Sequence, residues 1–225
     1  MHNNNDEVED SFQAFLVEVS EFTTEEEYPI IRRDMVPDRA PKKIMPFSKA
    51  ITFQGDLSHT AVCFFSPDKT FERVRRNPRR YLPFFKKTAG IVGLDFSVHS
   101  DMPLIKQKAQ MNDNLSLSFF YGNQGIPLYP SARCGAEILE DEYLKAFPKG
   151  TLIALGVHGF VKESQEKCEW LCWINKLVAT LRPSGFVVVG HLNGPLFDKA
   201  KAETPFYFYD SFIEERGKEV ASHVN

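Results

Sequence analysis

Four short apolar runs recur along the middle of this chain. Each has the length of a strand, contains β-branched or aromatic residues and is bounded by polar residues or glycine; they span residues 61–65, 91–98, 151–157 and 186–189. Runs that are apolar on both faces are typical of strands in a sheet that helices cover on both sides. We therefore expect four buried strands, with a further extended segment at residues 126–129.

Longer segments with apolar residues at helical spacing alternate with these runs. The helical segments that we expect span residues 70–87, with interruptions at Pro78 and Pro83, and residues 102–121, 137–147 and 164–181. Strands joined by helices pair in parallel, because the helix is the crossover that a parallel pair needs, and such crossovers are right-handed. The chain is thus predicted to be an α/β protein in which consecutive strand–helix units form a largely parallel sheet. Two architectures fit the spacing: an open doubly wound sheet and a partial barrel.

The two ends of the chain interrupt this alternation, so we expect three parts. Residues 1–50 form an N-terminal extension, with a short acidic amphipathic helix followed by a proline-rich extended connector. Residues 51–204 form the α/β domain. Residues 205–225 carry an aromatic, strand-like patch and then a charged tail.

Composition narrows the class of protein without indicating a ligand. The chain has 225 residues with ordinary apolar and charged fractions and a formal net charge of −3, so we expect a folded domain with a substantial core. No apolar stretch reaches the length that spans a bilayer, and the polar, acidic start lacks the features of a signal peptide. We therefore expect a cytoplasmic protein without a membrane partner. The four cysteines form no CxxC pair, and no pattern predicts a metal site or a particular cofactor.

Polar residues follow every predicted strand. In parallel α/β domains the loops after the strands converge at one edge of the sheet, and sites form there. The residues at this edge are Asp95, Ser97, Ser131, Arg133, His158, His191 and Asn193. We expect these side chains to lie close together and to form one site.

The residue types at this edge suit acid–base chemistry on an anionic ligand. The predicted catalytic residues are a carboxylate and two imidazoles, Asp95, His158 and His191. The predicted ligand-binding residues are Ser97, Ser131, Arg133 and Asn193. The arginine among them is expected to bind a phosphate or another anion. For the aspartate and the two serines the alternative is structural, since such residues commonly cap the following helix.

A second candidate surface lies in the segment between Arg32 and Lys87, where Lys and Arg outnumber Asp and Glu. Its densest part holds the arginines Arg73, Arg75, Arg76, Arg79 and Arg80. Such a cluster suits nucleic-acid binding, because cations neutralise phosphates while the interleaved rings of Tyr81, Phe84 and Phe85 stack on bases. The alternative is a solvated helix face that the acidic N-terminal segment balances or covers.

Several short motifs in this sequence resemble the domain of unknown function 4417 family. The motifs are Pro46-Phe47, Phe64-Phe65, Asp68, Phe71-Glu72, Asn77-Pro78, Leu94-Asp95-Phe96-Ser97, Asp101-Met102-Pro103, Gly125-Ile126-Pro127, Gly156-Val157-His158-Gly159, Leu181-Arg182-Pro183 and Gly190. The resemblance covers residues 40–200 and implies a cytoplasmic accessory protein of a phage or another mobile element. The family has no assigned activity, so the resemblance implies no catalytic residues. The sequence departs from the family pattern at Leu94, where proline is common, and near Cys134, where an aromatic residue is common.

Three functions are compatible with these observations. The first is an enzyme or ligand-binding domain of a phage or mobile element that acts on a phosphorylated or nucleic-acid-derived ligand. The second is an accessory factor that binds nucleic acid through residues 69–87. The third is an interaction factor that targets a host or replication protein through the acidic N-terminal segment or the aromatic tail.

Overall fold

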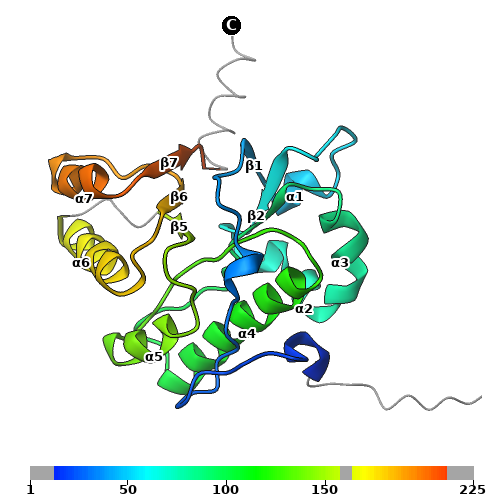
Figure 1. The fold of residues 1–225 in the computed structure, drawn as a ribbon, viewed down its shortest axis with the longest axis horizontal. Helices are drawn as coiled ribbons and strands as arrows, with labels where there is room; N and C mark the ends of the chain where they lie inside the picture. The colour runs from blue at the N-terminus through cyan, green and yellow to red at the C-terminus, as the bar shows by residue number, and fades with distance from the viewer. Residues whose placement is uncertain (1–12, 158–163, 212–225) are drawn as a thin grey trace, which may run out of the picture.

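The computed structural model of the chain describes residues 13–157 and 164–211. Strands and helices alternate along these residues, and Figure 1 shows the helices arranged around two small sheets. The strands are β1 (Lys43–Pro46), β2 (Thr60–Cys63), β3 (Gly90–Val92), β4 (Leu128–Tyr129), β5 (Leu152–Gly156), β6 (Gly185–Val189) and β7 (Phe206–Tyr209). The α-helices are α1 (Phe47–Ala50), α2 (Glu72–Arg76), α3 (Pro78–Phe85), α4 (Leu104–Asn123), α5 (Glu140–Leu144), α6 (Ser164–Leu181) and α7 (Asp198–Glu203). Short 3₁₀ helices are η1 (Ala14–Val17), η2 (Arg33–Met35), η3 (Asp68–Thr70), η4 (Glu137–Leu139) and η5 (Pro195–Phe197).

The strand pairs among the described residues are parallel. One sheet has the order β1-β2-β3-β4 and the other has the order β5-β6-β7. A parallel bridge between Ser131 and Ala154 links β4 to β5 where the sheets meet, together with a hydrogen bond of 2.8 Å from Ala154 N to Pro130 O. The prediction of a largely parallel α/β fold is therefore confirmed.

Strands that are neighbours in these sheets are also neighbours in sequence. A doubly wound sheet reverses its strand order at a switch point, whereas a barrel keeps the sequence order throughout. Across the described residues the order from β1 to β7 contains no such reversal. Of the two architectures that the spacing left open, the partial barrel fits this order. A site is then expected at the carboxyl ends of the strands.

The segment between η2 and β1 contacts both sheets, and it rises between them in Figure 1. Tyr129, the last residue of β4, donates a hydrogen bond of 3.1 Å from its hydroxyl to the carbonyl oxygen of Arg39. Tyr209, the last residue of β7, donates one of 2.6 Å to the carbonyl oxygen of Pro41. The predicted divisions of the chain after residues 50 and 204 stay predictions, although β1 and β7 pair with strands of the central part.

Buried rings pack next to the first sheet, and two of them, Phe47 and Phe64, directly follow β1 and β2. We call the five residues concerned the phenylalanine cluster: Phe47, Phe64, Phe71, Phe85 and Phe96, each 0% exposed. The ring centroids of Phe47 and Phe64 are 5.2 Å apart, and those of Phe71 and Phe96 are 4.6 Å apart. Burial of apolar area and the ring contacts both stabilise the fold. Rings therefore occupy the space next to the ends of β1 and β2.

Several predicted elements differ from the structure. The expected helix at residues 70–87 is divided into α2 and α3, and the one at residues 137–147 consists of η4 and α5. The strand expected at residues 91–98 is wrong beyond Val92, because β3 ends there and the backbone turns at Gly93, whose φ is 68°. A left-handed φ of this kind favours glycine. At the N-terminus the described part of the expected amphipathic helix is a single 3₁₀ turn, η1, and Val19 is 77% exposed instead of facing inward.

The long helices follow the sequence pattern more closely. α6 has the predicted bounds, residues 164–181, and α4 begins just after Pro103. A proline before the first turn is tolerated, because the N–H groups there have no partner within the helix. Among the described residues no helix is both long and apolar enough to cross a bilayer.

Candidate functional site

Asp95 lies in the loop after β3, at the centre of a buried polar network. Its Oδ1 accepts a hydrogen bond of 2.9 Å from Ser131 Oγ, and its Oδ2 forms an ion pair of 3.0 Å with Arg133 Nε. The side chain of Asp95 is 4% exposed and that of Arg133 is 18% exposed. Burial raises the pKa of the Asp95 carboxyl, although Arg133 and Ser131 act in the opposite direction. The network joins the loop after β3 to the loop after β4.

The two residues after Asp95 are held by other parts of the chain. Phe96 N donates to Asn114 Oδ1 of α4 at 2.8 Å, and Phe96 O accepts from Asn114 Nδ2 at 3.0 Å. Ser97 donates from its backbone N and its Oγ to the carboxylate of Asp68, which follows β2. An irregular loop with this many bonds places the residues that follow it in a fixed position.

A cavity of about 720 Å³ opens where the loops after β3 and β4 meet β5 and α6; we call it the α6 cavity. Its size suits a small organic ligand or a nucleotide. The polar and aromatic residues of its lining include His99, Ser131, Arg133, Glu137, Glu140, Glu169, Trp170, Cys172, Trp173 and Lys176. The cavity lies at the carboxyl side of β4 and β5, where the strand order predicts a site.

One face of α6 forms a wall of this cavity. Glu169, Trp173 and Lys176 recur at intervals of four and three residues, so they form a row along the helix. Trp173 donates from Nε1 to the carbonyl oxygen of Ala132 at 2.9 Å, which fixes the position of its ring. Trp170 and Trp173 are both only half-buried and line the cavity. The helix therefore presents two aromatic rings to the open space.

Lys176 is paired with two carboxylates of α5. Its Nζ lies 2.7 Å from Glu140 Oε2 and 2.8 Å from Asp141 Oδ1. Burial lowers the pKa of Lys176, but the bonds to Asp141 and Glu140 outweigh it, and the pKa is raised. Lys176 and Arg133 are the Lys and Arg side chains of the described cavity lining, and each has a carboxylate partner within the chain.

Asp95, Ser131 and Arg133 are the predicted site residues that the structure brings together. Ser131 and Arg133 line the α6 cavity, whereas Asp95 lies behind them and is not among the described lining residues. Ser97 adjoins this network through its bonds to Asp68. The geometry favours a role for Asp95 in holding Arg133, and a catalytic role for Asp95 stays a prediction.

The predicted residues after β5 and β6 are placed differently. His158 lies outside the described residues. His191 Nε2 is 3.8 Å from Asp210 Oδ1, and its ring stacks on Phe208 of β7. In the described part of the chain, neither His191 nor Asn193 lines the α6 cavity. Their predicted roles therefore stay untested and find no support in the position of this cavity.

The tryptophans are functional candidates that the sequence pattern missed. The helical period assigns Trp170 and Trp173 to the apolar face of a helix packed on the sheet, but the structure leaves both half-exposed on a cavity. The available signal was the presence of Glu169 and Lys176 on the same face, because charged residues are unusual in a buried helix face.

The arginines of the basic segment differ in what they contact. Arg75 pairs with Glu72 and with Asp113 at 2.9 Å each, and its guanidinium lies 4.7 Å from the ring centre of Phe96. The exposed arginines are Arg73, Arg76, Arg79 and Arg80. Nucleic-acid binding by these arginines stays a prediction.

The aromatic residues between the arginines face the interior. Tyr81 is 7% exposed and Phe85 is 0% exposed, and the ring of Phe84 packs 5.2 Å from that of Phe85. The expectation that the rings stack on bases is therefore wrong for Tyr81 and Phe85, because a buried ring offers no free face.

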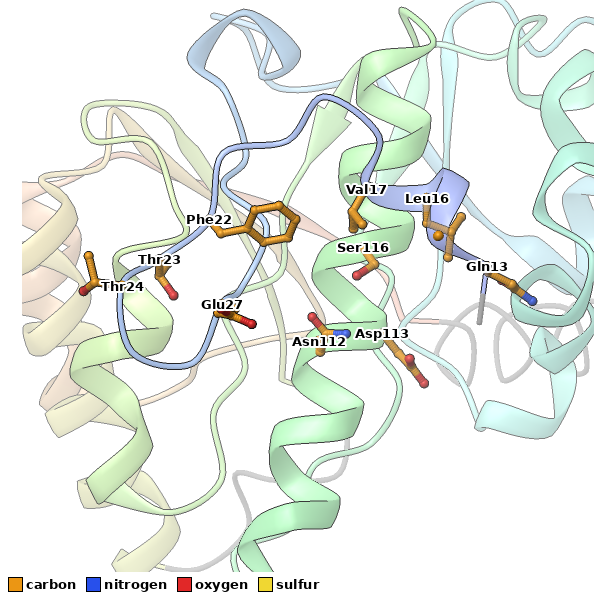
Figure 2. A pocket seen from close by; sticks show the side chains of 11 residues that line it. Gln13, Leu16, Val17, Phe22, Thr23, Thr24, Glu27, Asn112, Asp113 and Ser116 are labelled. Atoms are coloured by element: carbon orange, nitrogen blue, oxygen red, sulfur yellow. The ribbon is translucent and has the colours of Figure 1, made fainter. Parts of the chain in front are cut away.

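Residues 13–28, the described part of the acidic N-terminal segment, pack across α4 and enclose a second cavity, of about 420 Å³ (Figure 2). In Figure 2 Phe22 points from the segment towards α4, whose Asn112 and Ser116 line the cavity. The segment is attached through Glu26, whose Oε1 lies 2.6 Å from Lys108 Nζ of α4. None of the predicted site residues that the structure describes lines this second cavity.

Glu142 of α5 provides another attachment for the N-terminal segment. Its Oε1 accepts a hydrogen bond of 2.9 Å from Glu25 N, and its Oε2 pairs with Lys145. Burial opposes ionisation of Glu142, but the bond from Lys145 and the backbone N–H groups prevail and lower the pKa of its carboxyl to about 2. The segment also reaches the basic cluster, where the guanidinium of Arg79 lies 3.9 Å from the ring centre of Phe15.

The cysteines of the described residues differ in exposure, and no cluster of metal ligands accompanies them. Within them, no group of three or more His, Cys, Asp or Glu side chains is placed to hold a metal ion. Cys168 and Cys172 are exposed on α6, and Cys172 lines the α6 cavity. Burial raises the pKa of the Cys134 thiol to about 12, so this residue is not a nucleophile at neutral pH.

Fold and cavity together define the class of protein: an α/β domain with parallel sheets and a candidate site at the carboxyl side of β4 and β5. The chain belongs to the family described as a domain of unknown function (DUF4417), whose model matches residues 22–207. The resemblance inferred from the short motifs is therefore confirmed.

Among curated proteins the chain is similar to the Gene 1 protein of Mycobacterium phage D29, with 23% identity over 163 residues. The match covers 70% of this chain and 60% of the relative, so the chain spans less than two thirds of that protein's length. No solved structure matches the chain. The family and this relative connect the domain with phages and assign it no activity.

Proposed function

We propose that this protein is a cytoplasmic accessory protein of a phage or mobile element that binds a phosphorylated or nucleic-acid-derived ligand in the α6 cavity. The observation that carries the proposal is the pair of half-buried tryptophans, Trp170 and Trp173, in a cavity at the carboxyl side of the strands. Large aromatic side chains left next to water forgo part of the stabilisation that burial provides. A ligand that stacks on the rings restores it.

The cavity combines this aromatic wall with polar groups that can orient a ligand, as small-molecule sites do. A nucleobase gains about 1–3 kcal/mol by stacking on an aromatic side chain. Arg133 is held in place by Asp95 and Ser131 through the buried network, so a ligand that contacts it meets a pre-positioned group. His99 lines the same cavity and offers an imidazole for proton transfer if the ligand is a substrate.

Intrinsic fluorescence tests the proposal directly, because the chain contains 2 tryptophans and both line the cavity. We expect titration with a panel of nucleosides, nucleotides and sugar phosphates to identify a compound that changes the emission in a saturable way. Cys172→Phe places a ring inside the cavity and should weaken that compound's binding by about tenfold or more. Cys168→Phe, at an exposed position on the same helix outside the cavity lining, is the matched control.

Two outcomes would contradict the proposal. One is a panel in which no compound gives a saturable response. The other is equal loss of binding in Cys172→Phe and Cys168→Phe, since the effect would then not depend on the cavity.

A second candidate function is nucleic-acid binding, which the exposure of four arginines in α2 and α3 favours. Fluorescence anisotropy with labelled single-stranded DNA should then show binding that weakens with salt, by about 0.7 in logarithmic slope for each phosphate contact. Arg76→Glu combined with Arg80→Glu should abolish it, whereas Cys172→Phe should leave it unchanged. If binding changes neither with salt concentration nor in the Arg76→Glu, Arg80→Glu variant, these arginines are not the nucleic-acid-binding surface.

Protein interaction is a third candidate, since Tyr207 and Phe208 of β7 are 41% and 40% exposed. Exposed aromatic side chains are common in protein interfaces. A pull-down with the full chain should then recover one stoichiometric partner, and Tyr207→Ser with Phe208→Ser should release it.

A further inference from the structure

We infer that the α6 cavity recognises the hydrogen-bond donor edge of a nucleobase through Glu169, and that a phosphate group contributes little to binding. The inference rests on the proposed function, because it names the part of a nucleic-acid-derived ligand that the cavity reads. Three features of the wall support it: its charge, the row of side chains on α6 and the fixed ring of Trp173.

The cations of the wall are already neutralised within the chain. Arg133 Nε lies 3.0 Å from a carboxylate oxygen of Asp95, which is 4% exposed and inaccessible to a competing ligand. Lys176 Nζ lies 2.7 Å from Glu140 and 2.8 Å from Asp141. A phosphate that enters the cavity therefore meets cations whose charge is balanced, and it gains little Coulomb attraction.

Two further carboxylates, Glu137 and Glu169, line the described part of the cavity. Glu169 Oε1 accepts a hydrogen bond of 3.2 Å from the side-chain amide of Gln165, a neutral group that does not cancel the charge. Carboxylates repel phosphate and bind N–H donors with charge-assisted hydrogen bonds. The wall thus favours the donor groups of a base over the phosphates of a nucleotide.

Bases differ in the donors that they offer to a carboxylate. Guanine presents its N1–H and its amino group side by side, which matches the two oxygens of one carboxylate. Adenine and cytosine present an amino group, and a carboxylate is a known partner for the amino group of cytosine. Uracil presents a single N–H between two carbonyl oxygens, which a carboxylate repels. The expected order of affinity therefore begins with guanine and ends with uracil.

The row on α6 brings a carboxylate and a ring to the same base. Glu169 and Trp173 are four residues apart on one helix face, and the Cβ atoms of such a pair are about 5–6 Å apart. A base stacked on Trp173 then has its edge within reach of the Glu169 carboxylate. Because the ring of Trp173 is fixed by its bond to Ala132, stacking costs little conformational entropy.

Fluorescence titration with guanosine, guanosine monophosphate and uridine tests this inference on the full chain. Guanosine and its monophosphate should bind with affinities within about threefold of each other, and uridine should bind about tenfold more weakly. Glu169→Gln should weaken guanosine about tenfold and leave uridine nearly unchanged. Glu166→Gln, on the same helix but outside the cavity lining, is the matched control and should bind as the unmodified chain does.

The outcomes separate this inference from the proposed function. Equal affinity for guanosine and uridine, a monophosphate that binds far more tightly than the nucleoside, or an unchanged guanine preference in Glu169→Gln would each overturn the inference alone. If no compound of the wider panel gives a saturable response, both the inference and the proposed function are overturned.

Discussion

Two places at the same edge of the fold are built in different ways. Next to β1 and β2 the rings of the phenylalanine cluster are fully buried and pack against one another. Next to β4 and β5 the α6 cavity remains, and its tryptophans Trp170 and Trp173 are half-exposed. Side chains in the first place contribute mainly to stability. Those in the second are available to a ligand, which is why we assign function to the second place.

Removal of a ring from the phenylalanine cluster should have the largest effect on stability. Phe64→Ala leaves a cavity at a position that is 0% exposed, and we expect the free energy of unfolding to fall by about 3–5 kcal/mol. Urea denaturation followed by circular dichroism measures this change. Trp170→Ala should cost much less, because its side chain is only half-buried. If Phe64→Ala and Trp170→Ala lower the free energy of unfolding equally, the phenylalanine cluster and the α6 cavity do not differ in their contribution to stability.

The ion pair between Asp95 and Arg133 should have the next largest effect, because it is buried behind the α6 cavity. Arg133→Ala leaves the Asp95 carboxylate without this cation, and we expect a loss of about 3 kcal/mol. Asp95→Asn combined with Arg133→Met should recover part of that loss, since neither charge remains. A double-mutant cycle measures the coupling between the two positions. Strictly additive effects would show that the pair does not join the two loops.

Acid should destabilise the attachment of the N-terminal segment, because the ionised carboxyl of Glu142 accepts a hydrogen bond from the backbone of that segment. The pKa of Glu142 is lowered from 4.5 to about 2 in the folded chain. A carboxyl whose pKa is lower in the folded than in the unfolded state stabilises the fold above pH 4.5, and the contribution is lost as the pH falls to about 2. Denaturation at several pH values in this range should show a smaller acid dependence for Glu142→Gln. If the unmodified chain and Glu142→Gln lose stability equally as the pH falls, Glu142 is not the source of the acid dependence.

The smallest effect should come from the tyrosine hydroxyl at the end of β7. Tyr209→Phe removes the hydrogen bond of 2.6 Å to Pro41 O, and we expect a loss of about 0.5–1.5 kcal/mol in the free energy of unfolding. Thermal denaturation measures it, with Tyr129→Phe as the corresponding change in the other sheet. A cost as large as that of Phe64→Ala would show that the connector, and not the phenylalanine cluster, dominates stability.

Much of the fold was predictable from local pattern. The parallel sheet follows from the short apolar runs, and α6 has its predicted bounds because its apolar residues recur at a constant interval before Pro183. β1 was not predictable, since its four residues include Lys43 and Pro46 and its strand conformation depends on pairing with β2. β3 ends early because the backbone conformation at Gly93 is not encoded in the apolar pattern.

The candidate site was predictable where neighbouring strands meet. Asp95 and Arg133 follow β3 and β4, which are adjacent, so their loops come together. His191 follows β6 of the other sheet, and three strand spacings from β3 amount to about 14 Å. The tryptophans were harder to predict as site residues, because the apolar pattern does not show whether a helix face packs fully on a sheet. The charged residues Glu169 and Lys176 on that face were the one available signal.

Acrylamide quenching of tryptophan fluorescence tests the central claim, that the α6 cavity is a ligand site, most directly. Both tryptophans line this cavity, so the signal reports on no other place in the molecule. We predict that acrylamide quenches the free chain and that guanosine monophosphate protects it, while the same concentration of nucleotide gives clearly less protection in Cys172→Phe. The claim would be contradicted if neither the nucleotide nor any other compound of the panel changed the quenching by acrylamide.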